Sequence, residues 1–210
     1  MRKLLMAAFI IACAAPFTFA QTASGDYNKL DVGVLFSHNR VDTGFDDPSQ
    51  NFIKDREGFN GVEGFVKGNL SRYVGVVGDY SFHRKSFNDT FGSTNIGVDV
   101  DLHTLMGGVE LKDNSPETKV KPFARGLVGF QHARANSNVS DVVCIQVIGV
   151  PCPADFNESD NGFSAAVGGG VDFRVSPRVD IRAVQLDYNP TRLGGETQHN
   201  FRVGVGVIFR

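Results

Sequence analysis

The chain has 210 residues, enough for one domain of ordinary size, with 24 glycines, 18 phenylalanines and no tryptophan. Its formal net charge of −2 gives no polybasic surface for nucleic acid. After the first twenty residues, no stretch is apolar enough to cross a bilayer as a helix, which needs about 20 apolar residues. The composition therefore argues against a nucleic-acid-binding protein and against a helical membrane protein.

The first segment of the chain, residues 1–20, has the pattern of a secretory signal peptide. Arg2 and Lys3 form a short basic start, and an apolar run follows over 4–12 before a small residue ends the segment. We expect cleavage here and a single domain over 21–210. Removing the segment leaves 19 basic against 23 acidic residues, a formal charge of −4.

The three cysteines allow more than one interpretation. Cys13 ends an Ile-Ile-Ala-Cys run that loosely resembles a lipobox, so a lipidated N-terminus is an alternative to cleavage after Ala20. Cys144 and Cys152 form an even pair in an exported chain, which predicts a disulfide closing a small loop. Free or metal-bound thiols are the alternative, although no histidine lies between them and two thiolates alone rarely hold zinc.

Beyond residue 21 the apolar residues alternate with polar or small ones, the period of a β-strand rather than a helix. The alternation slips once near Ala183, which predicts a β-bulge. In chain order, the pattern predicts eight strands at 30–37, 60–70, 73–82, 98–110, 121–133, 163–174, 179–188 and 200–209.

The predicted connections alternate in length. Short ones cover 71–72, 111–120 and 175–178, and longer ones cover 38–59, 83–97, 134–162 and 189–199. Short turns at one end and long loops at the other are typical of an up-and-down β-barrel in an outer membrane, with both termini on the periplasmic side. The segment 134–162 is the longest loop and carries the cysteine pair.

The two faces of these strands differ in kind. One carries Val, Phe, Ala and Tyr with almost no charge, whereas the other mixes small residues with charges of both signs. An eight-stranded barrel is just wide enough to be filled by side chains. We therefore expect a network of paired charges inside the barrel, made by Glu63, Lys67, Asp79, Arg125, Asp172, Arg182, Asp187 and Arg202. The alternative is a soluble barrel of lipocalin type with the apolar face inward.

The last predicted strand is the most specific feature. Its alternating residues resemble the terminal strand that the outer-membrane assembly machinery recognises, although Arg210 follows the final Phe. Residues 181–188 and 121–129 resemble the penultimate and fifth strands of the outer-membrane-protein β-barrel domain family, the small OmpA- and OmpX-like barrels. The expected assembly signal consists of Phe201, Val203, Val205, Val207 and Phe209.

This resemblance implies a fold and a place in the cell. It implies an all-β, eight-stranded antiparallel up-and-down transmembrane β-barrel in the bacterial outer membrane, exported through the periplasm. The implied partners are outer-membrane lipids and lipopolysaccharide, and the assembly machinery. We expect a monomer, and no cofactor, metal or nucleic acid.

Three functions fit these expectations. The first is a structural, stabilising outer-membrane protein with loops available for binding, and the second is a surface adhesin that uses loop 134–162. The third is a lipid-A-modifying enzyme, which needs a serine close to a histidine. His132 has no serine before Ser137, so we expect no catalytic residues. We expect His103 inside the barrel and the other histidines, His38, His83, His132 and His199, at strand ends.

Overall fold

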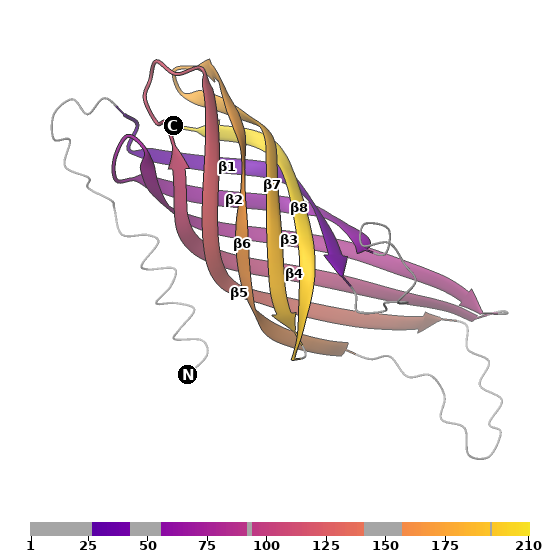
Figure 1. Cartoon of the computed structure of the whole chain (residues 1–210). Helices are drawn as coiled ribbons and strands as arrows, with labels where there is room; N and C mark the ends of the chain where they lie inside the picture. Colours follow the sequence, from indigo (N-terminus) through magenta and orange to yellow (C-terminus); the bar gives the residue numbers. More distant parts are fainter. Residues whose placement is uncertain (1–26, 43–55, 92–93, 141–156, 194) are drawn as a thin grey trace, which may run out of the picture.

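The computed structural model describes five ranges of the chain: 27–42, 56–91, 94–140, 157–193 and 195–210 (Figure 1). They form eight strands: β1 (Leu30–Asp42), β2 (Arg56–Asn69), β3 (Val74–Phe91), β4 (Thr94–Lys112), β5 (Val120–Ser140), β6 (Asn157–Ser176), β7 (Val179–Leu193) and β8 (Glu196–Phe209). Each strand pairs antiparallel with the next, and β1 pairs with β8 to close the barrel. The predicted fold class is confirmed.

Within the described residues, no helix is long and apolar enough to span a membrane.

At the short-turn end of the barrel, the predicted strand bounds lie within a few residues of the observed ones. At the opposite end, most of the predicted strands stop too early. The predicted loops 83–97 and 189–199 are wrong, because β3 and β4 are separated only by 92–93, and β7 and β8 by two residues. Loop 134–162 is also shorter than predicted, since β5 and β6 occupy both of its ends. The apolar alternation stops in these segments although the strand continues.

The reason is a reversal of polarity at the far end of the barrel. Strands β3–β6 have 18 to 21 residues, and they extend beyond the other four (Figure 1). Toward this end the outward side is polar, where Arg84 pairs with Asp99 at 2.9 Å. The inward side includes an apolar group, in which Phe59 and Leu102 are buried against Val41. A sequence scan for outward apolar residues therefore ends each strand too early.

The middle of the barrel carries an outward belt of large apolar side chains. Their exposed fractions reach 69% at Phe130. A continuous belt of this kind is unsuited to water but is what a hydrocarbon layer requires of a barrel. Because the apolar face points outward, the alternative of a soluble lipocalin-type barrel is wrong. Every strand contributes to the belt, including Val34, Val66, Val76, Leu105, Val128, Val167, Leu186 and Val205.

Inward-facing glycines allow neighbouring strands to approach each other in this narrow barrel. A Cβ atom added at Gly168 would lie 2.2 Å from the backbone oxygen of Leu186, and one at Gly170 would lie 1.9 Å from that of Val184. Atoms cannot approach this closely, so the backbone would have to shift. This close packing explains why β6 has glycine at positions 168 and 170.

We expect Gly168→Ala to lower the free energy of unfolding by about 1–3 kcal/mol, the usual range for overpacking. The matched control is Gly78→Ala, because a Cβ atom at Gly78 meets nothing within 4 Å. Unfolding in urea can be followed by gel shift, since a folded barrel migrates faster than a boiled one. Equal midpoints for the two variants would contradict this explanation.

Candidate functional site

Five of the eight predicted interior charges meet in the middle of the barrel. Arg125 of β5 lies 2.9 Å from Glu63 of β2 and 3.2 Å from Asp79 of β3. Arg202 of β8 lies 3.2 Å from Asp79 and 3.1 Å from Asp187 of β7. All five side chains are fully buried. We call this the central cluster, in which two guanidinium groups are shared among three carboxylates.

The other three predicted charges, Lys67, Asp172 and Arg182, belong to a second cluster nearer the short turns. Lys67 lies 2.7 Å from Asp31 and 2.9 Å from Glu110. The Asp172 carboxylate forms ion pairs with Lys112 at 2.9 Å and with Arg182 at 2.8 Å. These six residues form what we call the lower cluster, and their side chains are also fully buried, with three cations facing three acids.

The predicted bulge in β7 connects the two clusters. The register with β8 shifts between Arg182 and Gln185, so both side chains face the lumen although they are three residues apart. Gln185 accepts a hydrogen bond from Arg182 at 2.8 Å and donates one to Glu63 at 2.8 Å. If β7 alternated regularly from Arg182 to Gln185, without the bulge, one of the two side chains would face the lipid.

Apolar side chains fill the space around the charges. The Arg182 guanidinium lies 3.8 Å from the ring centre of Phe123 and 4.7 Å from that of Phe65. Such contacts favour a buried cation. A layer of buried apolar residues completes the packing: Leu35, Phe65, Val77, Met106, Leu127, Ala166 and Ile208. The lumen at these levels is occupied by the chain's own side chains.

Sequence reasoning left several network residues out of the predicted set. Glu110 and Lys112 lie on the inward face of β4, and Lys121 lies four residues before Arg125 on the inward face of β5. The alternation of inward and outward residues along each strand could therefore have identified all three. Lys121 pairs with Asp180 at 3.1 Å. Gln185 could not have been recognised, because it is neutral and lies directly after the bulge.

Three histidine predictions are wrong. His103 does not face the interior, because its ring lies on the outward side of β4, where Nδ1 is 2.9 Å from the Tyr80 hydroxyl. His83 is not at a strand end, because β3 continues to Phe91, and its side chain is buried in the lumen. His132 likewise lies within β5, because that strand continues to Ser140.

The buried His83 forms a pair with a serine. Its Nε2 lies 2.9 Å from Ser37 Oγ, and both side chains are at most 1% exposed. The other ring nitrogen, Nδ1, has no hydrogen-bond partner among the described residues. A nucleophile needs access to its substrate and a group that orients its base, and this pair has neither within the described part of the chain. His132 contacts Asn161 rather than a serine.

Several predictions fall on residues outside the described ranges. These are the signal peptide over 1–20 with the alternative at Cys13, and the disulfide between Cys144 and Cys152. They stay predictions. Within the described ranges, no group of three or more His, Cys, Asp or Glu side chains is arranged to hold a metal ion.

The geometry agrees with a comparison against known families. A family model described as an outer membrane protein beta-barrel domain matches residues 5–209. The chain belongs to this family. Membership, together with the outward apolar belt, makes the chain an outer-membrane β-barrel protein and confirms the family resemblance seen in the sequence. Because outer-membrane barrels have short turns in the periplasm and longer loops outside the cell, we infer that the short-turn end is periplasmic and the extended strands are extracellular.

Two solved structures of outer-membrane proteins show the same barrel fold. Ail, the attachment invasion locus protein of Yersinia pestis, is 16% identical over 86% of this chain and 97% of its own, with a TM-score of 0.52. Neisserial surface protein A is 14% identical over 89% of this chain and 99% of its own, with a TM-score of 0.51. At this identity the likeness concerns the fold alone. No curated protein matches the chain.

The terminal strand of this family member has the expected outward pattern. Val203, Val205, Val207 and Phe209 are exposed on the outer face of β8, while Arg202 points into the lumen.

An ion pair joins two turns at the periplasmic end. Arg72, between β2 and β3, lies 3.0 Å from Asp113, between β4 and β5. This hydrogen bond holds the pKa of the Asp113 carboxyl well below its ordinary range. The two turns are thereby tied together in the periplasm.

Proposed function

We propose that this chain is an integral outer-membrane protein with a structural, stabilising role, and that its extracellular loops are available for binding. The observation that carries the proposal is the filled lumen. Within the central cluster and within the lower cluster, cations and carboxylates form ion pairs inside the barrel, and apolar side chains pack around them. An isolated charge buried in the lumen would cost several kcal/mol. The paired charges therefore favour a rigid barrel, cross-linked through its interior by ion pairs, over an open channel.

The partners follow from the same surfaces. The outward apolar belt is suited to lipid tails, and the membrane facing the loops supplies lipopolysaccharide. The alternating outer face of β8, from Phe201 to Phe209, is the segment we propose for recognition by the barrel-assembly machinery. Since β1 and β8 pair with each other, the barrel leaves no open sheet edge within the membrane, which is consistent with a monomer.

A second candidate, a surface-binding module, is favoured by one observation. Strands β5 and β6 continue past the apolar belt to Ser140 and from Asn157, so both strand ends lie beyond the belt (Figure 1). Ail, which shares the fold, has been crystallised with the heparin analogue sucrose octasulfate. Binding through the loop 134–162 is therefore the function to test beside the structural one.

Complementation of a deletion strain distinguishes these functions. We expect the deletion to raise sensitivity to detergents and bile salts. Wild-type protein and a variant with 141–156 replaced by a short Gly-Ser linker should both restore resistance, because the brace lies in the barrel. The replacement also removes Cys144 and Cys152, so a Cys144→Ser variant serves as the control for the thiols.

Other results would point elsewhere. Unchanged resistance in the deletion strain would contradict the structural role. Normal resistance combined with loss of heparin-agarose binding in the linker variant would favour the surface-binding module. Lipid A of altered mass in a strain carrying His132→Ala would favour the enzyme, which we do not expect.

A further inference from the structure

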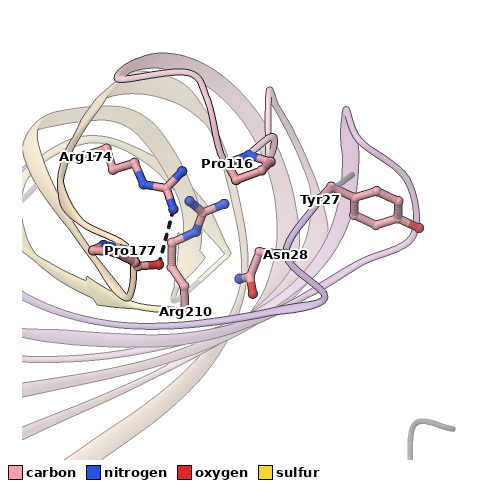
Figure 2. Close-up of a pocket in the computed structure, with 6 residues that line it drawn as sticks. All are labelled: Tyr27, Asn28, Pro116, Arg174, Pro177 and Arg210. Carbon is pink, nitrogen blue, oxygen red and sulfur yellow. Dashed lines mark hydrogen bonds between the residues drawn. The ribbon is translucent and has the colours of Figure 1, made fainter. Parts of the chain in front are cut away.

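A pocket of about 240 Å³ lies at the periplasmic mouth of the barrel (Figure 2). Four separate parts of the chain meet there: the segment before β1, the turn between β4 and β5, the turn between β6 and β7, and the end of β8. Its volume corresponds to several water molecules, at about 30 Å³ each. The lining residues are Tyr27, Asn28, Pro116, Arg174, Pro177 and Arg210.

Two guanidinium groups point into this pocket (Figure 2). Arg210 has only 3% of its side chain exposed and donates one hydrogen bond, to the backbone oxygen of Asn114 at 2.8 Å. Arg174 donates to the backbone oxygens of Ser176 and Pro177 at 3.3 and 3.2 Å. Within the described part of the chain, the Nη1 atoms of both arginines lack a hydrogen-bond partner.

The nearby carboxylates are shared with other cations. Arg210 Nε is 3.6 Å from Asp31 and 3.7 Å from Asp180, within ion-pair distance but beyond hydrogen-bond distance. Asp31 is already 2.7 Å from Lys67, and Asp180 is 3.1 Å from Lys121. Among the described residues, no acid lies within ion-pair distance of Arg174.

Among the charged side chains around the pocket, cations outnumber carboxylates. In the lower cluster three cations face three acids, and the pair of Lys121 and Asp180 is neutral. With Arg174 and Arg210 included, six cationic side chains share four carboxylates, and Arg174 has none of these carboxylates within ion-pair distance. A buried cation without an anion is costly, so the arrangement is suited to a negatively charged ligand.

We propose that this pocket binds one oxyanion of the phosphate type. Guanidinium groups present paired N–H donors that match phosphate oxygens in geometry and in charge. Two guanidinium groups at one pocket match a dianion better than a single carboxylate. Free periplasmic phosphate and the headgroup of a phospholipid at the barrel rim share this chemistry.

The test is calorimetric titration of inorganic phosphate into the folded chain in detergent at about pH 8. We expect saturable binding with one phosphate per chain. Arg174→Gln and Arg210→Gln should each weaken it at least tenfold. The matched control is Arg178→Gln, because Arg178 lies in the same turn, is exposed and does not line the pocket. Its effect should stay within twofold.

The proposal is overturned by the absence of saturable phosphate binding, by equal weakening in Arg178→Gln, or by tighter binding of acetate than of phosphate. If Arg210→Gln fails the gel-shift test of folding, Arg174→Gln carries the test, because Arg174 makes no ion pair within the described residues.

A second titration identifies the source of the oxyanion. The chain is placed in nanodiscs of phosphatidylcholine, with and without phosphatidic acid. Loss of phosphate binding in the discs that contain phosphatidic acid would assign the pocket to a lipid headgroup. Unchanged phosphate binding would assign it to the free ion.

Discussion

Replacing Arg125 with methionine is expected to lower the free energy of unfolding by about 3–5 kcal/mol, the range for breaking a buried ion pair from one side. Arg125 contacts all three acids of the central cluster, with distances of 2.9 Å to Glu63 and 3.2 Å to Asp79. Its removal leaves Arg202 alone among three buried carboxylates. Methionine keeps much of the side-chain volume, so the loss reports charge rather than a cavity.

The measurement is urea unfolding in detergent, followed by circular dichroism and gel shift because the chain has no tryptophan. A matched control is Arg84→Gln, because Arg84 is 53% exposed and its pair with Asp99 should contribute at most about 1 kcal/mol. Adding Asp79→Asn to Arg125→Met removes one excess negative charge and should recover part of the loss. Equal midpoints for Arg125→Met and Arg84→Gln would show that the network does not brace the barrel.

Replacing Val128 with arginine is expected to cost about 2–4 kcal/mol, whereas the same change at Val120 should cost about 1 kcal/mol or less. Both side chains are on the outer face of β5, with exposed fractions of 58% and 52%. Val120 is the first residue of the strand, beside the periplasmic turn, and Val128 is eight residues further into the belt. The difference between them therefore measures depth in the hydrocarbon layer.

Both variants are unfolded in urea from lipid bilayers and compared with wild type. In detergent micelles, which deform around a charge, the difference should shrink. A larger cost at Val120 than at Val128 would mean that the apolar belt is displaced along the barrel axis from the position inferred here.

The sequence by itself determined the fold class and the face on which most side chains lie. Alternation with a period of two is a local property, so each strand can be recognised without its neighbours. In β8, the outward Val203, Val205 and Val207 and the inward Arg202 are arranged as predicted. All eight predicted interior charges are buried in the lumen for the same reason.

Strand length was not determined in this way. The alternation reports a strand only while its outer face meets an apolar medium. Beyond the belt, β3 continues with Arg84 outward and Phe87 inward, and the pattern that defined the strand is lost. The same effect misplaced His83, which was assigned to a strand end.

Only the tertiary structure decided which charges meet. Arg125 is 62 residues from Glu63 and from Asp187 in the sequence, and closure of the barrel brings them together. The break in alternation near Ala183 was visible in the sequence. The sequence did not show that this bulge places Gln185 where it connects the two clusters. The periplasmic pocket, too, exists only because β8 pairs with β1 and β7, which places Arg210 beside Arg174. A period along one strand carries no information about the partner across the lumen, because that distance is set by closing the sheet on itself.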